Sequence, residues 1–293
     1  MNLSGSFTAL YTPFGADGQV DLELYRALCH RLLDAGVGLV PCGTTGETPT
    51  LNGDEYDALV RMAVEASAGR RPVIAGTGSN STSATIALTR RAKELGADVA
   101  LVVVPYYNKP PQASLKAHFR AVADEGGLPV MLYNVPGRTA LNMETDTTLE
   151  LAEHPNIVAV KEACGDIDQI GRICLGAPED FFVLSGDDAL TLPLIRAGGH
   201  GAVSVAGNVA PAGLQALVQA ALDGDRALAD EWQARLLPLF DALFISSNPI
   251  PVKRAAEILG HAHRRVRLPL IDSEMSPPMT EKLAAALRTA GLQ

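Results

Sequence analysis

The sequence predicts an α/β fold, a TIM (β/α)8 barrel with a C-terminal helical appendage. Short apolar runs typical of buried strands recur eight times, at intervals of about 25–30 residues. Between them lie segments whose apolar residues repeat with helical spacing. After residue 210 the strand-like runs stop, and helical segments follow one another. Buried strands that alternate with helices in this way are the pattern of a barrel.

The expected strands are the eight apolar runs, which are bounded by turn-forming residues. They are FTALYT from Phe7, GLVPCG from Gly38, PVIAGTG from Pro72, DVALVVVP from Asp98, PVMLYN from Pro129, IVAVKEA from Ile157, FFVLSGD from Phe181 and GAVSVA from Gly201. The alternative fold is a doubly wound open sheet, which would carry a glycine fingerprint after its first strand. Thr12-Pro13-Phe14 stands there instead, and no GxGxxG occurs, so the barrel is favoured.

The first expected helix places Leu22, Leu28 and Leu32 on one face, and Asp21 can cap its N-terminus. Similar patterns predict barrel helices over residues 85–95, 112–124, 144–152, 167–175 and 189–197. Later patterns cover residues 213–222, 227–244, 252–259 and 280–290. We therefore expect a barrel over residues 1–224 and a C-terminal helical domain over residues 225–293.

The composition disfavours several classes of protein. The 293 residues carry a net charge of −9, whereas nucleic-acid-binding domains are usually basic. No apolar stretch approaches the ~18 residues of a membrane-spanning helix, and the N-terminus lacks the regions of a signal peptide. The cysteines form no CxxC pair; they are Cys29, Cys42, Cys164 and Cys174. We expect free thiols and a cytoplasmic protein without nucleic-acid or membrane partners.

The stretch from Ile157 to Ala163, IVAVKEA, places a lysine directly after an apolar strand. An ammonium group is costly to bury, and burial favours the neutral amine, which is a nucleophile for carbonyl carbon. Lys161 has an ordinary alternative, which is to reach water or pair with a carboxylate. The other strand ends distinguish the two interpretations, because the active site of a TIM barrel lies at the C-terminal ends of its strands.

These strand ends supply hydroxyls, tyrosines and one arginine. Strand two ends in Thr44-Thr45-Gly46, a turn whose N–H and hydroxyl groups can hold a carboxylate. Strand five ends in Tyr133, and Arg138 follows in the next loop. Taken singly, these are an ordinary turn, a core aromatic and a surface charge. Together with Lys161 at one end of a barrel, they indicate Schiff-base chemistry on a keto acid, with the phenol moving protons.

No metal site is expected. No HxH or HExxH motif occurs, and His200 precedes strand eight, at the opposite end of the barrel. An acidic pair such as Asp187-Asp188 more often caps the following helix than binds a divalent ion. Paired carboxylates on neighbouring strands, which a glycosidase needs, are missing.

Several motifs carry a resemblance to a known family. They are GTTGETPTL from Gly43, GTGSN from Gly76, PYYNKP from Pro105, YNVPGRT from Tyr133, VAVKEA from Val158, LSGDD from Leu184 and NPIPVK from Asn248. In this order the chain resembles, over essentially its whole length, the class I aldolase-like lyases of the dihydrodipicolinate synthase and N-acetylneuraminate lyase family. At Thr44 and Arg138 the chain resembles the dihydrodipicolinate synthase branch of the family. Sialic acid lyases usually have a serine in place of this threonine and lack the arginine.

The resemblance implies a reaction and site residues. That branch condenses pyruvate with L-aspartate 4-semialdehyde to 4-hydroxy-tetrahydrodipicolinate in lysine biosynthesis through diaminopimelate, with no cofactor beyond a covalent Schiff base. The implied catalytic residues are Lys161 for the Schiff base and Tyr133, Thr44 and Tyr107 for proton relay. The implied substrate-binding residues are Thr45 for the pyruvate carboxylate, Arg138 for the semialdehyde carboxylate, and Gly186 and Val203 in the pocket lining. In this family the second relay tyrosine comes from a neighbouring subunit, which implies a homo-oligomer, commonly a tetramer built from dimers.

Other activities stay open at this point. Relatives act on N-acetylneuraminate, a 2-keto-3-deoxy sugar acid or hydroxy-oxoglutarate, and a catalytically silent barrel would serve as a keto-acid sensor. The intact lysine, tyrosine and threonine set argues against the sensor.

Feedback inhibition by L-lysine is frequent in the family, in a cleft between subunits. Asn80 and Tyr106 match the positions that bind the inhibitor. Tyr56 stands where a histidine is frequent, and Ala84 where an acidic residue is frequent. Without that carboxylate the ammonium group of lysine loses a charged partner, so we expect weak or absent inhibition.

Overall fold

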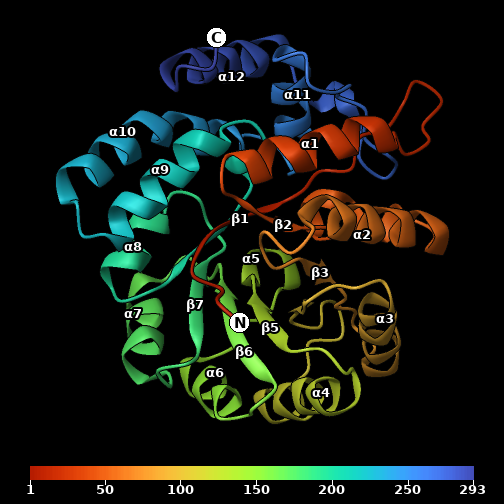
Figure 1. Ribbon diagram of the computed structural model, residues 1–293, viewed down its shortest axis with the longest axis vertical. Coiled ribbons are helices and arrows are strands. Elements are labelled where there is room, and N and C mark those ends of the chain that lie inside the picture. The colour runs from red at the N-terminus through yellow and green to blue at the C-terminus, as the bar shows by residue number, and fades with distance from the viewer.

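The computed structural model describes residues 1–293 and shows eight parallel strands in a nearly closed barrel, surrounded by helices (Figure 1). The predicted barrel is therefore confirmed. Its strands are β1 Gly5–Ala9, β2 Gly38–Val40, β3 Ile74–Gly76, β4 Val99–Val103, β5 Val130–Asn134, β6 Ile157–Glu162, β7 Phe182–Ser185 and β8 Gly201–Ser204. They pair in the order β2-β1-β8-β7-β6-β5-β4-β3. A parallel bridge between Leu39 and Val73 connects β2 to β3 and completes the ring.

The barrel helices are α1 Leu22–Asp34, α2 Gly53–Ser67, α3 Thr82–Glu94, α4 Gln112–Glu125, α5 Pro136–Thr139, α6 Thr145–Ala152, α7 Ile167–Gly176, α8 Thr191–Arg196 and α9 Pro211–Leu222. The Asp21 side chain caps α1 as expected, accepting the N–H of Leu24 at 2.9 Å. α3 begins at Thr82 rather than at the expected residue 85, because Ser81 caps it. The helix α2 begins in a capping box formed by Asn52 and Glu55.

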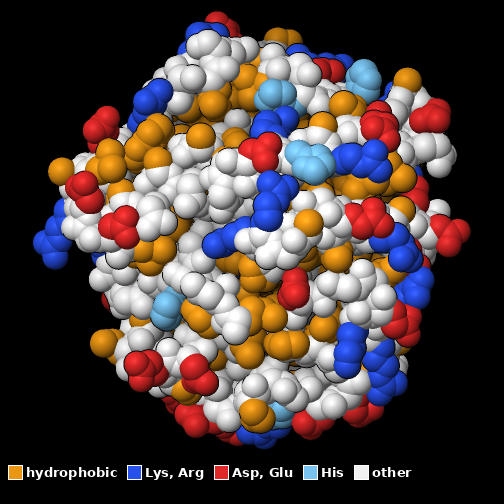
Figure 2. Space-filling model, in the orientation of Figure 1, with side chains coloured by type: hydrophobic (Ala, Val, Ile, Leu, Met, Phe, Trp, Pro, Cys, Tyr) orange, Lys and Arg blue, Asp and Glu red, His pale blue; other side chains and the backbone are white.

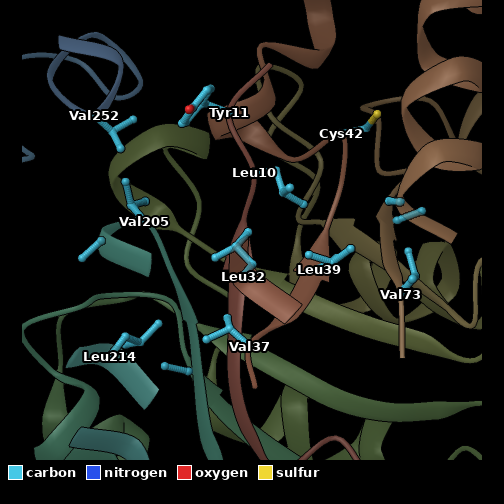
Figure 3. Packing of buried hydrophobic residues seen from close by; sticks show 14 of the residues in the cluster. Leu10, Tyr11, Leu32, Val37, Leu39, Cys42, Val73, Val205, Leu214 and Val252 are labelled. Carbon is cyan, nitrogen blue, oxygen red and sulfur yellow. The ribbon is translucent and has the colours of Figure 1, made fainter. Parts of the chain in front are cut away.

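Three further helices follow α9; the first of them packs against α9, and the last packs against the other two (Figure 1). They are α10 Arg226–Ala242, α11 Ile250–Ile258 and α12 Pro277–Thr289. Their apolar faces join the same large hydrophobic cluster that fills the space between barrel and helices. Figure 3 shows Val252 of α11 with Tyr11 and Val205 in this cluster. The boundary expected after residue 224 stays a prediction, because the core is continuous across it.

A smaller cluster fills the inside of the barrel. Side chains alternate between the two faces of a strand. On β5, Met131 and Tyr133 belong to the inner cluster, whereas Leu132 belongs to the outer one. On β6, Ala159 points inward and Val160 outward. The same alternation turns the next residue, the lysine of the motif, into the mouth of the barrel.

Glu162, the last residue of β6, points outward and is fully buried. Its Oε1 accepts hydrogen bonds from Asn134 Nδ2 and from the backbone N of Cys164, each at 2.9 Å. Gln169 of α7 donates to Oε2 at 3.4 Å. Burial raises the pKa of the Glu162 carboxyl, and these donors partly offset that effect. The network ties the C-terminal end of β6 to β5 and to α7.

The surface carries both charge signs. Acidic and basic side chains are interspersed over the face shown in Figure 2. No helix in the structure combines the length and the apolar composition needed to cross a membrane.

Candidate active site

A cavity of about 350 Å³ opens at the C-terminal ends of the strands. Six of the eight predicted site residues line it: Thr44, Thr45, Tyr133, Arg138, Lys161 and Gly186. They come from the ends of β2, β5, β6 and β7 or from the loops that follow. Part of the remaining wall is supplied by the C-terminal region, with Phe240, Asp241, Phe244 and Asn248. The position agrees with the general location of active sites in TIM barrels.

Lys161 is 5% exposed, and its exposed surface faces this cavity. Its Nζ lies 4.1 Å from the centroid of the Tyr133 ring, which is the neighbouring position on β5. No carboxylate forms an ion pair with Lys161, and the side chain does not extend to the outer surface. The ordinary interpretation, a lysine that reaches water or pairs with an acid, therefore does not fit. The amine is left available to a ligand in the cavity.

Gly186 follows β7 and lies directly against the lysine side chain. A Cβ at this position would come within 2.9 Å of Lys161 Cε and 2.9 Å of the Ala163 methyl group. Real Cβ atoms do not approach other atoms so closely. The absence of a side chain at Gly186 thus provides the space through which the lysine crosses to the cavity.

The turn after β2 is the 3₁₀ helix η1, Thr44–Gly46. Thr12 Oγ1 donates to the carbonyl oxygen of Gly46 at 2.7 Å, and Thr48 Oγ1 donates to that of Gly43 at 2.9 Å. These bonds fix the turn at both ends. Thr45 is almost completely buried beside the cavity, so its backbone and hydroxyl form a rigid polar wall. Such a wall suits a small carboxylate.

Arg138 lies in the short helix α5, which follows β5. It is exposed, and its guanidinium lines the rim of the cavity. Nη2 donates to the carbonyl oxygen of Asn248 at 3.4 Å, which leaves most of its donors free. A second cavity of about 330 Å³ shares Thr44, Tyr133 and Arg138 with the first. The arginine therefore stands where the two cavities meet.

The other two predicted residues do not line this cavity. Val203 pairs with Phe7 on β1 and belongs to the inner cluster, deeper in the barrel. The lining residue from this part of the chain is Val205, just beyond β8. Tyr107 is 89% exposed in the loop after β4, with a left-handed backbone at φ 74°. It does not line the cavity of its own chain.

The acidic pair after β7 serves the fold. Asp187 Oδ1 accepts the N–H of Ala189, and Asp188 Oδ2 accepts those of Val205 and Ala206 at 3.0 and 2.9 Å. Asp188 is buried, which raises the pKa of its carboxyl. No group of three or more His, Cys, Asp or Glu side chains is placed to hold a metal ion.

Comparison with known proteins agrees with this geometry. The model of the dihydrodipicolinate synthetase family matches residues 2–290. The chain belongs to this family. A 4-hydroxy-tetrahydrodipicolinate synthase of Moorella thermoacetica is 52% identical over 286 residues, with 97% of each chain covered.

Solved structures of the dihydrodipicolinate synthetase family superimpose closely. The dihydrodipicolinate synthase of Aquifex aeolicus matches with a TM-score of 0.94 and 47% identity, covering 99% of each chain. The enzyme of Acinetobacter baumannii, solved in complex with pyruvate, matches with a TM-score of 0.96 and 39% identity over the whole of both chains. The family and the barrel fold are thus consistent with one another.

One member of the site in this dihydrodipicolinate synthetase fold was not singled out from the sequence. Asn248 lines the cavity, donates from Nδ2 to Thr45 Oγ1 at 2.9 Å, and accepts from Arg138 through its carbonyl. It lies 203 residues from Thr45 in the sequence. The motif NPIPVK was the available signal, but it gave no geometric reason to place Asn248 beside the turn.

Proposed function

We propose that this chain condenses pyruvate with L-aspartate 4-semialdehyde to 4-hydroxy-tetrahydrodipicolinate and water, in lysine biosynthesis through diaminopimelate. The observation that carries the proposal is Lys161, a buried and unpaired amine that faces a cavity with a carboxylate-binding turn and a phenol. The name of the Moorella thermoacetica relative and the pyruvate complex of the Acinetobacter baumannii enzyme support the substrate pair. The reaction is a class I aldolase-type lyase reaction that needs no cofactor.

In the first stage the Lys161 amine attacks the keto carbon of pyruvate, and water leaves as the Schiff base forms. Thr45 and its neighbouring N–H groups hold the pyruvate carboxylate. Loss of a methyl proton gives the enamine, which forms a carbon–carbon bond to the aldehyde of the second substrate. The amine of that substrate then closes the ring by displacing Lys161, which regenerates the free enzyme.

Each stage requires proton transfer beside the lysine. Tyr133 is placed for this, because its ring lies next to Lys161 Nζ. Thr44 lines the same cavity and extends the relay toward its rim. Tyr107 completes the relay from a neighbouring subunit, and its exposure in the single chain supports this arrangement. We therefore infer a homo-oligomer, a tetramer built from dimers, located in the cytoplasm.

The test is borohydride reduction of the protein in the presence of pyruvate, followed by peptide mass spectrometry. We expect a reduced pyruvyl adduct on Lys161 and on no other lysine. An unmodified Lys161 would exclude every lyase assignment and leave the keto-acid sensor. Steady-state assays then compare aspartate semialdehyde with N-acetylneuraminate, 2-keto-3-deoxy sugar acids and hydroxy-oxoglutarate, and we expect turnover with aspartate semialdehyde alone.

Arg138→Ala should raise the KM for aspartate semialdehyde by about 10- to 100-fold, because a charged hydrogen bond to its carboxylate is lost. The KM for pyruvate should change little, since its carboxylate is held by the turn at Thr45. Steady-state kinetics with each substrate varied in turn measure both constants. Arg120→Ala is a matched control, because that arginine pairs with Glu150 on the outer surface. Equal effects on the two substrates would contradict the assigned role.

L-Lysine should inhibit weakly or not at all. Tyr56 is buried and its hydroxyl donates to the carbonyl oxygen of Gly76, so it is not available to a ligand. Ala84 is exposed and offers no carboxylate for the ammonium group of lysine. Initial rates at increasing L-lysine concentration measure the effect. Half-maximal inhibition at micromolar lysine would show this prediction to be wrong. If the missing carboxylate is the cause of weak inhibition, Ala84→Glu should strengthen it.

A further inference from the structure

Glu47 immediately follows the turn that contains Thr44 and Thr45. Its backbone is left-handed, with φ 55° and ψ 34°, and its N–H donates to the carbonyl oxygen of Thr44 at 3.1 Å. Residues with a Cβ adopt this conformation reluctantly and keep it where the surrounding structure holds them. The conformation of Glu47 therefore defines the end of the carboxylate-binding turn. Contacts from the surrounding structure are needed to keep this left-handed conformation.

The C-terminal region supplies that restraint. Lys253 Nζ of α11 lies 2.5 Å from Glu47 Oε1, and the backbone N of Arg267 donates to Oε2 at 2.8 Å. The side chains of Lys253 and Glu47 are 0% and 2% exposed. Lys253 also donates to the carbonyl oxygen of Arg265 at 2.8 Å. The carboxylate of Glu47 thus has two fixed polar neighbours, and both of them belong to residues 253–267.

The pair is enclosed on its remaining sides. Lys253 Nζ lies 4.0 Å and the Arg267 guanidinium carbon 4.3 Å from the centroid of the Phe14 ring. Arg267 also pairs with Glu55, which closes the region toward solvent. Burial lowers the pKa of Lys253 to about 8, and Glu47 opposes that shift. Lys253 lines neither of the two cavities at the barrel mouth. Its contact with the turn is made through Glu47.

A second contact with the turn Thr44–Gly46 comes from Asn248, two residues before the start of α11. Asn248 Nδ2 donates to Thr45 Oγ1 at 2.9 Å. Because Thr45 Oγ1 accepts this bond, its own proton stays available for another acceptor, and both residues line the cavity. Asn248 Oδ1 is buried without a hydrogen-bond partner. The two links are thus carried by one short segment, residues 248–253.

We propose that residues 248–253, at the start of α11, position the turn Thr44–Gly46 that binds the pyruvate carboxylate. Lys253 acts through Glu47, and Asn248 acts through Thr45. The proposal rests on the proposed function, because it assigns the turn to pyruvate. Lys253 and Asn248 are positioning residues in this scheme. The C-terminal helices would then set the affinity of the site for its first substrate as well as covering the barrel.

The decisive variant is Glu47→Gln combined with Lys253→Met. It removes both charges together, and a buried pair replaced as a unit often leaves stability unchanged, whereas removal of one partner does not. The glutamine oxygen can still accept from Arg267. We expect a thermal midpoint close to that of the parent enzyme and a pyruvate KM raised by at least about tenfold, with a smaller change in kcat. Arg254→Met on the same helix is the matched control, because that arginine pairs with Glu257 away from the turn.

Asn248→Ala gives an independent measurement that does not disturb the buried pair. We expect a higher pyruvate KM with little change in the KM for aspartate semialdehyde, and a slower approach to the borohydride-trapped adduct at low pyruvate. A purely structural role would lower the thermal midpoint and leave the pyruvate KM unchanged, and that result in either variant would overturn the proposal. If the parent enzyme forms no pyruvyl adduct, the proposed function fails first and this inference fails with it.

Discussion

Lys161→Met should remove turnover almost completely, with kcat/KM falling by more than about 10³-fold, as expected for loss of a covalent nucleophile. Methionine keeps the unbranched shape that passes Gly186, so the barrel interior should remain packed. The variant cannot form a Schiff base, and borohydride should trap no pyruvate. The measurements are the steady-state rate, the mass of the trapped protein and the thermal midpoint.

The control for this variant is Lys282→Met on α12, an exposed lysine that does not line the cavity. It should retain full activity and full pyruvyl labelling. Substantial residual activity in Lys161→Met, with a correct thermal midpoint and labelling of another lysine, would mean that the nucleophile has been assigned wrongly.

Tyr133→Phe should lower kcat by about 10²- to 10⁴-fold, which is about 3–5 kcal/mol of barrier. The phenyl ring remains beside Lys161 Nζ, so packing is preserved and only the proton-transferring hydroxyl is lost. Adduct formation should slow rather than disappear, because the lysine is still present. Single-turnover trapping at increasing times, beside steady-state kinetics, separates these two effects.

A matched control is available in Tyr25, which is also buried and whose hydroxyl has no hydrogen-bond partner. Tyr25→Phe removes the same atom from the outer core and should leave kcat unchanged. If Tyr133→Phe behaved like Tyr25→Phe, the proton relay would have to run through other groups.

The barrel could be predicted from the sequence because each element carries a local signal. The apolar runs mark strands buried on both faces, and caps such as Asp21 mark where helices begin. Alternation along β6 also explains why Lys161 and not Glu162 faces the cavity. Helix ends were less accurate where a cap was overlooked, as at Ser81.

The predicted part of the site is the part that follows strands directly. Lys161, Tyr133 and the turn at Thr44 could be placed because parallel strands end at one face of the barrel. The depth of Val203 could not be predicted, because it depends on how far each strand is staggered against its neighbours.

The contribution of the C-terminal region could not be predicted at all. Lys253 lies in the helix predicted over residues 252–259, and its partner Glu47 is 206 residues away. Only the packing of α11 against the turn after β2 reveals that both are buried. Long-range pairing of this kind leaves no local pattern.

The outward-facing Glu162 makes β6 intolerant of insertion or deletion. A shift of one residue would place a carboxylate in the cavity and force the lysine between barrel and α7, where Asn134 and Gln169 offer it only amide groups. Such a shift would remove the nucleophile from the cavity. It would also leave both Lys161 and Glu162 without their present partners. Length variation among descendants of this chain should therefore be confined to loops and surface helices, while the residue count of β6 stays fixed.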